Sequence, residues 1–147
     1  MSAPFPHRYH VALESDAGAP SRLLAPPRPI ILGGPPPEFG GQDDCWSPEH
    51  LLLSSLLLCL GATFRALAGR ARLEVPRYRA RAEGVLDKTE QGLAFTAITI
   101  EAELETAEAD AERAERLLQS AKAHCIVGNS LKTPVELRIS MKALAAG

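Results

Sequence analysis

The chain has 147 residues and a mass of 15.7 kDa, and its 46% hydrophobic and 23% charged residues are typical of one soluble globular domain with an ordinary core. A formal net charge of −2 and a pI near 6.1 provide no electrostatic attraction to nucleic acid or to a membrane, so neither is expected as a partner. The first nine residues contain two prolines and no apolar core, which predicts that no secretory signal is present. Three cysteines in a chain that is not exported indicate a cytoplasmic, reducing location, where disulfides are usually transient.

Residues 1–46 are predicted to form short strands and irregular loops, because the first 48 residues hold ten of the twelve prolines. The segment 33–41, GGPPPEFGG, cannot be regular structure, since prolines and paired glycines define a shaped loop. Alternating apolar side chains predict three short strands, at residues 9–13, 21–25 and 30–32, with a turn at 16–18 between the first two.

A long helix is predicted over residues 47–69, with Ser47 as its N-cap, Pro48 in its first turn and Glu49 near the positive end of its dipole. The run 51–64 is apolar enough to suggest a membrane span, but its 14 residues fall short of the roughly 20 that a span needs. The sequence therefore predicts a helix that is buried on nearly all sides. A chain of this size has to cover such a helix completely, which favours a dimer.

The remaining chain is predicted to alternate between strands and one further helix. Strands are expected within residues 72–104, with a hairpin turn at 88–92, and a last strand is expected at 134–142. A second helix is expected over 108–127, with Cys125 on its buried stripe and Gly128 as its C-terminal cap. This order of elements predicts a single α+β domain over residues 1–147, with antiparallel strand pairing.

Two of the three cysteines, Cys59 and Cys125, lie in these helical segments. A thiol in an apolar helix usually packs as a small hydrophobe, and that interpretation remains open here. Two such thiols, far apart in sequence and close to polar or basic residues, also predict a dithiol that cycles through a disulfide. The sequence has no cysteine or histidine pair at the spacing of a zinc site, no phosphate-binding glycine motif and no GxSxG motif, so no metal or bound cofactor is expected.

A dithiol that reduces peroxides needs a thiolate, because the thiolate is the form that attacks the O–O bond. An arginine held by a carboxylate lowers the pKa of such a thiol and orients the peroxide. Glu49 is the candidate carboxylate, although its position also suits a plain helix N-terminal charge. His124, next to Cys125, is expected to complement the C-terminal end of its helix rather than to act as a base.

Two segments of the chain resemble the OsmC/Ohr family, named after osmotically inducible protein C and organic hydroperoxide resistance protein. The segment SPEHLLLSSLLLCLGATF, residues 47–64, resembles the family's N/SPE-x-L-L-x-A-x-x-x-C segment. The segment AHCIVGNSLKTPVEL, residues 123–137, resembles its second-cysteine segment, with Gly128 where serine is common. The loop GGPPPEFGG also resembles a family loop, and the resemblance extends over residues 9–141.

The resemblance implies an OsmC-like α+β fold in which antiparallel sheets pack around a buried central helix of an intertwined homodimer, with active sites at the subunit interface. Cys59 matches the family's peroxidatic cysteine, Cys125 its resolving cysteine and Glu49 the carboxylate of the SPE motif. The family's arginine comes from an N-terminal turn of the GGR type, which this chain lacks; Arg22 is the first placement and Arg28 the second.

The implied activity is that of a thiol-dependent peroxidase that reduces organic hydroperoxides to alcohols. Cys59 is expected to attack the peroxide, Cys125 to form the disulfide with it, and an external dithiol of the lipoyl or thioredoxin type to reduce that disulfide. Apolar neighbours of Cys59 favour alkyl or lipid hydroperoxides over hydrogen peroxide. The alternatives are a non-enzymatic stress or binding protein of the same fold and a thiol redox sensor. No role in the family matches Cys45.

The spacing of Glu49 and Cys59 predicts a shared site. Ten residues of straight helix separate them by about 15 Å, which a glutamate side chain cannot bridge. If both residues serve one site, Glu49 therefore reaches Cys59 of the partner subunit, and the active site is completed in trans.

Overall fold

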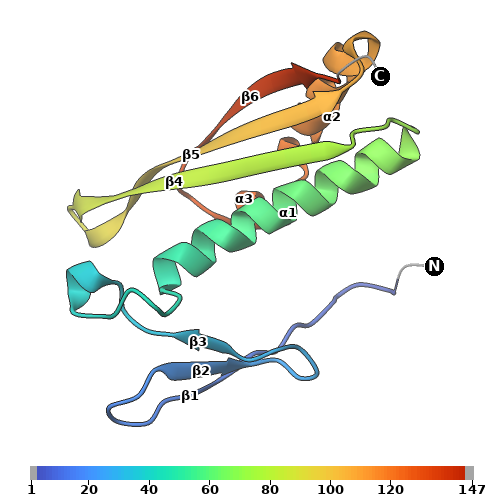
Figure 1. Ribbon diagram of the computed structural model, residues 1–147. Helices are drawn as coiled ribbons and strands as arrows, with labels where there is room; N and C mark the ends of the chain where they lie inside the picture. The colour runs from blue at the N-terminus through green and yellow to red at the C-terminus, as the bar shows by residue number, and fades with distance from the viewer. Residues whose placement is uncertain (1–2, 145–147) are drawn as a thin grey trace. The chain divides into compact units, whose positions relative to one another are not determined.

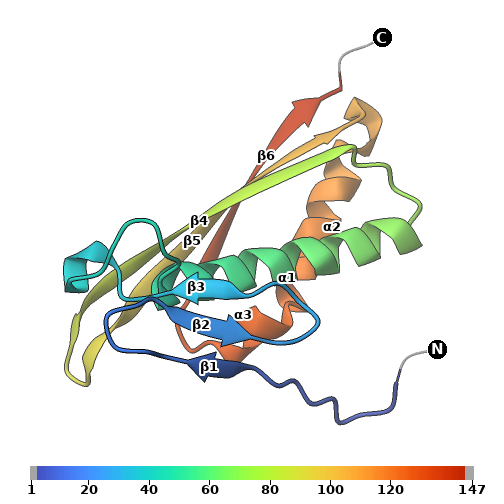
Figure 2. The same ribbon diagram turned by 60° about the horizontal axis from the view of Figure 1, so that its bottom comes forward.

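The computed structural model describes residues 3–144, and the chain divides into two compact units, Met1–Leu51 and Leu52–Gly147. The first unit contains a three-stranded antiparallel sheet in the order β1-β2-β3 (Figure 2). The turn between the first two strands contains Gly18 at φ +79, a conformation that glycine adopts without strain. The strands of this sheet are β1 (Ala12–Glu14), β2 (Ser21–Leu24) and β3 (Ile31–Gly33). The sequence predicts all three strands and the turn between the first two.

The loop after β3 has a fixed shape, as its prolines and glycines predict. It contains one turn of 3-10 helix, η1 (Pro37–Phe39), which ends at Gly40 with φ +85. The next glycine, Gly41, lies so close to the backbone of Pro35 that a Cβ there would be 1.5 Å from the Pro35 carbonyl oxygen. A glycine is therefore required at position 41, because any side chain would collide with the chain four residues before it.

Helix α1 spans Pro48–Arg70 and begins at the predicted cap: the Ser47 hydroxyl accepts a hydrogen bond from the backbone N–H of His50 at 3.1 Å. Only one stripe of α1 is buried within the chain, formed by residues at a spacing of four, Leu56, Leu60, Phe64 and Ala68. The prediction of burial on nearly all sides is therefore wrong for the single chain, in which Leu58 is 75% exposed. With 23 residues and a mean hydropathy of 1.9 over an 18-residue window, α1 has the length and composition of a membrane-spanning helix, as core helices of soluble proteins also do.

The second unit contains a three-stranded sheet in the order β4-β5-β6 (Figure 1). Strands β4 (Arg77–Thr89) and β5 (Gly92–Thr106) form a long antiparallel hairpin, as predicted. The last strand, β6 (Val135–Ala143), pairs with β5 in parallel, so the prediction of antiparallel pairing is wrong for this pair. A parallel pair needs a crossover connection, and the helical segment between β5 and β6 supplies it.

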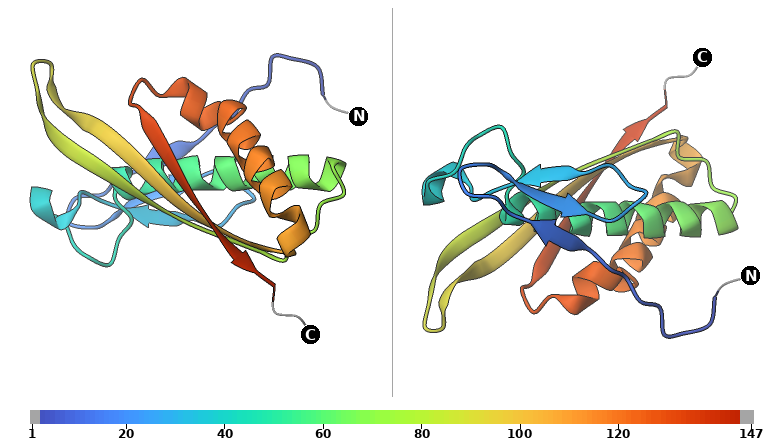
Figure 3. Two further views of the ribbon diagram at one scale, coloured as in Figure 1. Left: turned by 90° about the horizontal axis from the view of Figure 1, so that it is seen from above. Right: turned by 90° about the horizontal axis from the view of Figure 1, so that it is seen from below.

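One face of this sheet forms the core. Alternate side chains of β5 point inward and are almost fully buried, namely Ile98, Ile100, Ala102, Leu104 and Thr106. The buried stripe of α1 packs on this face together with the buried side chains of α2 (Ala111–Ala123), which runs across α1 in Figure 3. Both helices thus contribute to one hydrophobic core, and the α+β class is confirmed.

The second predicted helix is interrupted. In place of one helix over 108–127, the chain forms a 3-10 turn η2 (Glu108–Asp110), then α2, and then a short helix α3 (Ile126–Ser130). Cys125 lies at the break in an extended conformation, with φ −70 and ψ 111. His124 is the C-terminal cap of α2, and Gly128 lies inside α3, so the predicted cap at Gly128 is wrong. The break leaves the first backbone N–H groups of α3 free of intrahelical bonds beside Cys125.

Candidate active site

The fold brings Cys59 and Cys125 together. Cys59 lies near the middle of α1, and Cys125 precedes α3 with only 2% of its surface exposed. Each thiol is among the groups that shift the pKa of the other, so the two side chains lie close together within the second unit. No disulfide joins the two cysteines in this structure. Convergence of these two residues was the central expectation from the sequence.

The surroundings of Cys59 favour its thiolate. Partial burial by itself raises the pKa of Cys59, but hydrogen bonds to the sulfur outweigh that effect and leave the pKa below its usual value. The donors are the backbone N–H groups of Val127 and Ile126, the Cys125 thiol and the Thr63 hydroxyl. Together these groups favour a negative charge on the Cys59 sulfur, as a nucleophilic thiol requires.

Cys125 has the opposite tendency. Burial raises its pKa most, and the neighbouring Cys59 raises it further, while the backbone N–H of Gly128, 3.5 Å from the Cys125 sulfur, counteracts part of this rise. The surroundings therefore favour the thiolate of Cys59 over the thiolate of Cys125.

Sequence reasoning missed the donors of Ile126 and Val127. A continuous helix through residue 125 would have kept these N–H groups in intrahelical hydrogen bonds, whereas the start of α3 leaves them free to reach Cys59. Thr63 was detectable, because it follows Cys59 by four residues and so lies on the same face of α1. Its hydroxyl also donates to the Cys59 carbonyl at 2.8 Å.

Tyr78 also approaches this cluster from β4. Its ring packs against Phe64 at a centroid distance of 5.5 Å, and its hydroxyl is buried without a hydrogen-bond partner among residues 3–144. Burial raises the pKa of Tyr78 to about 12, the charge of Cys125 adds to this rise, and Arg65 offsets part of it. The Tyr78 side chain is therefore uncharged and packs beside the cysteines; it does not act as a base.

Glu49 lies in the first turn of α1, ten residues before Cys59, and is not among the groups that shift the pKa of Cys59. Its Oε2 atom is shielded from solvent and has no hydrogen-bond partner in the described part of the chain. A shielded carboxylate oxygen without a donor is unusual, since buried polar atoms are normally paired. The role of Glu49 at the thiol site stays a prediction.

Both predicted arginines lie in the first unit, where each has a local partner. Arg22, on β2, forms an ion pair with Glu14 on β1 at 2.9 Å, and Arg28 donates to the Ala25 carbonyl at 3.4 Å. Over residues 3–144, no guanidinium is among the groups that shift the pKa of Cys59. The role of Arg22 or Arg28 at the site likewise stays a prediction.

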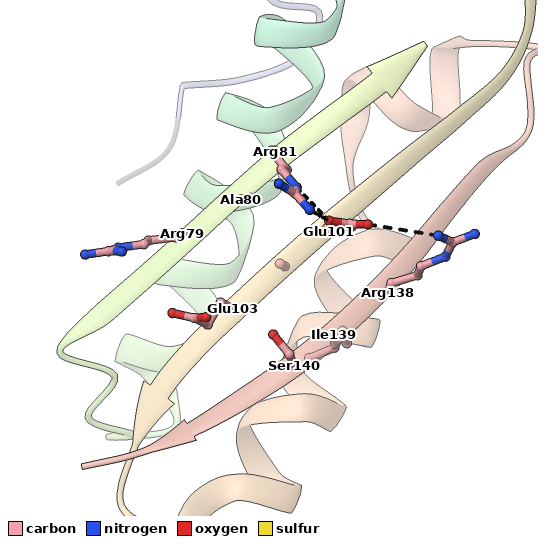
Figure 4. A pocket seen from close by; sticks show the side chains of 9 residues that line it. Arg79, Ala80, Arg81, Glu101, Glu103, Arg138, Ile139 and Ser140 are labelled. Atoms are coloured by element: carbon pink, nitrogen blue, oxygen red, sulfur yellow. Dashed lines mark hydrogen bonds and ion pairs between the residues drawn. The ribbon is translucent and has the colours of Figure 1, made fainter. Parts of the chain in front are cut away.

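A groove of about 490 Å³ lies on the opposite, outer face of the β4-β5-β6 sheet (Figure 4). Glu101 on the middle strand forms ion pairs with Arg81 on one side and with Arg138, at 4.0 Å, on the other. These charges largely satisfy one another, and the groove contains no thiol. The candidate site is therefore the dithiol in the core and not this groove.

The chain was compared with known proteins. The family model described as OsmC-like protein matches residues 41–140, which is more than half of the chain. Among curated proteins, Peroxiredoxin OsmC of Escherichia coli (strain K12) is 28% identical over 97 residues, a match that covers 66% of this chain and 68% of that protein.

Solved structures show the same fold. An OsmC-like protein of unknown function from Vibrio cholerae superposes with a TM-score of 0.82 at 18% identity, covering 92% of this chain and 100% of that one. An organic hydroperoxide resistance protein from Legionella pneumophila superposes with a TM-score of 0.72 at 19% identity, covering 93% and 99%. The family model and the fold agree, and the chain belongs to the OsmC-like family.

Proposed function

We propose that the protein is a thiol-dependent peroxidase that reduces organic hydroperoxides through a Cys59–Cys125 disulfide. The observation that supports this most strongly is the pair of facing thiols whose pKa values are shifted in opposite directions. A peroxidase needs one thiolate and one protonated neighbour, and this arrangement matches that need. The similarity to Peroxiredoxin OsmC and to a protein named for organic hydroperoxide resistance supports the same activity.

The proposed cycle begins with attack of the Cys59 thiolate on one oxygen of the peroxide. The O–O bond breaks, the alkoxide takes up a proton and leaves as the alcohol, and Cys59 becomes a sulfenic acid. Cys125 then loses its proton and attacks the Cys59 sulfur, and the hydroxyl group leaves as water. An external dithiol of the lipoyl or thioredoxin type returns two electrons and restores both thiols.

Glu49 and an arginine, Arg22 or Arg28, are proposed to complete the site from a second copy of the chain. Two features support a homodimer. The apolar surface of α1 is incompletely covered by its own chain, and Leu58 is 75% exposed. The shielded Oε2 of Glu49 has no donor of its own, which fits a carboxylate that pairs with a guanidinium supplied by assembly.

Free-thiol counting tests the activity against its alternatives. On addition of cumene hydroperoxide, the peroxidase is expected to lose two thiols per chain and to regain them with a dithiol. A non-enzymatic stress or binding protein loses none, and a redox sensor loses two but sustains no repeated turnover with reductant in excess. An apolar site also predicts faster turnover of cumene hydroperoxide than of hydrogen peroxide, and the reverse preference would contradict that part of the proposal.

Completion of the site in trans has its own test. Mixed dimers are prepared with Cys59→Ser in one subunit and Glu49→Ala in the other. If Glu49 acts on the partner's thiol, one of the two sites in each mixed dimer is intact, and about half of the activity of the unmodified dimer is expected because one of two independent sites remains. A mixed dimer without activity rejects a site shared in this way.

A further inference from the structure

A second, smaller cavity lies beside the dithiol. It has a volume of about 160 Å³ and lies among α1, β5, α2, α3 and β6, all within the second unit. Cys125 is part of its lining and Cys59 is not. The apolar part of its lining is Leu56, Leu60, Ile100 and Val135, and the polar part is Lys122, Asn129 and Thr133. Of the two cysteines, Cys125 alone borders this cavity, although only 2% of its surface is exposed to solvent.

Gly128 keeps this cavity open next to the Cys125 sulfur. A Cβ built at position 128 would lie 3.5 Å from Cys125 Sγ and 3.5 Å from Leu56 Cδ1, which is direct van der Waals contact with both. Any larger side chain would occupy the space in front of the sulfur.

The chemistry of exchange distinguishes the two sulfurs of a disulfide. An incoming thiolate attacks one sulfur and expels the other, and a leaving thiol of lower pKa leaves faster. Hydrogen bonds from Val127, Ile126 and Thr63 favour the thiolate of Cys59, whereas burial disfavours the thiolate of Cys125. Reduction is therefore fastest when Cys125 is attacked and Cys59 leaves.

We propose that the reductant enters through the cavity at Gly128 and attacks Cys125, while the peroxide reacts at Cys59. This inference rests on the proposed peroxidase cycle. The incoming thiolate forms a bond to Cys125 Sγ, the Cys59–Cys125 bond breaks, and Cys59 leaves as the thiolate. The second thiol of the reductant then attacks the reductant sulfur that is bonded to Cys125. The Cys125 thiolate leaves and takes up a proton, and the reductant becomes a disulfide.

Trapping of the mixed disulfide tests which sulfur is attacked. The protein is oxidised with one equivalent of cumene hydroperoxide, mixed with the monothiol N-acetylcysteamine, and quenched in acid at early times, and the modified peptide is identified by mass spectrometry. The adduct is expected on Cys125, with Cys59 free. An adduct on Cys59 overturns the inference while leaving the peroxidase cycle intact, whereas failure to form any disulfide would instead reject the cycle itself.

Narrowing the cavity tests the route. Gly128→Ser is expected to slow reduction of the disulfide by dihydrolipoamide about tenfold more than it slows oxidation by cumene hydroperoxide, because misplacement of a reacting group by about 1 Å has effects of this size or larger. Val135→Leu fills the same cavity from β6 and serves as a second variant if Gly128→Ser folds poorly. Gly69→Ala is the matched control, because a Cβ there meets no atom within 4 Å. Equal slowing of both half-reactions by both cavity variants overturns the route.

Discussion

Cys59 and Cys45 are both partly buried thiols in the same chain, and their surroundings give them opposite properties. Around Cys59, backbone N–H groups and hydroxyls lower the pKa despite burial. Around Cys45, partial burial and the Asp44 carboxylate, which lies 3.7 Å from the sulfur, both raise the pKa. The comparison teaches that exposure does not decide which cysteine reacts; the sign of the nearest partial charges does.

The largest expected effect comes from removing the reactive thiol. Cys59→Ser should reduce peroxidase turnover by more than about 10³-fold, as loss of a nucleophile does in other enzymes. Steady-state rates with cumene hydroperoxide and excess dithiol measure this. Cys45→Ser is the matched control and should leave the rate unchanged; a comparable loss in that variant would show that the contrast between the two thiols is wrong.

Removing the partner thiol should separate the first turnover from the later ones. Cys125→Ser leaves Cys59 with its backbone donors, so one equivalent of hydroperoxide should still be consumed, and the enzyme should then stop as the sulfenic acid. A sulfenic-acid reagent and mass spectrometry detect that product. Full multiple turnover in this variant would mean that Cys125 has no resolving role.

A smaller effect is expected when one donor to Cys59 is removed. Thr63→Val keeps the shape of the side chain but removes the hydroxyl, so the pKa of Cys59 should rise and its alkylation by iodoacetamide should need higher pH. Because the reactive form is the thiolate, the alkylation rate falls as the pH falls through the Cys59 pKa. Below that pKa, Thr63→Val should be slower by about fivefold, the effect of one hydrogen bond of about 1 kcal/mol. An unchanged pH profile would show that the Thr63 hydroxyl does not lower the pKa of Cys59.

The smallest effect is expected at Cys45. Asp44→Asn removes the carboxylate that raises the pKa of Cys45, so alkylation of this thiol near pH 8 should become faster by about twofold, because exposed charges interact weakly in water. Peptide mapping of the alkylated protein separates Cys45 from the other two cysteines. Slower alkylation in this variant would contradict the electrostatic explanation of the contrast.

Local patterns in the sequence predicted the fold class and the positions that strands and helices bury. The alternation of Ile98, Ile100 and Ala102 along β5 and the cap at Ser47 are both local signals, and the structure contains both. The direction of β6 was predicted wrongly, because side-chain alternation is the same in parallel and antiparallel strands. The break at Cys125 was missed for a similar reason. Cys125 is buried whether or not the helix is interrupted, so the spacing of apolar residues does not reveal the interruption.

Local sequence likewise predicted only part of the candidate site. The two cysteines were predictable from their sequence context, whereas the N–H donors of Ile126 and Val127 depend on where one short helix begins. Glu49 and Arg22 stay predictions, because the proposed site in which they meet Cys59 needs a second copy of the chain. Backbone groups and subunit contacts are thus the parts of such a site that residue identities alone do not encode.

Cys59 and Cys125 are 66 positions apart in the chain, and this separation has a mechanical consequence. A covalent bond between them would close a large ring and reduce the freedom of the unfolded polymer, which stabilises the oxidised form by about 4 kcal/mol. If the proposed disulfide forms, the oxidised protein should therefore resist heat and proteases better than the reduced protein. Melting temperature would then report the redox state of the protein without any added dye.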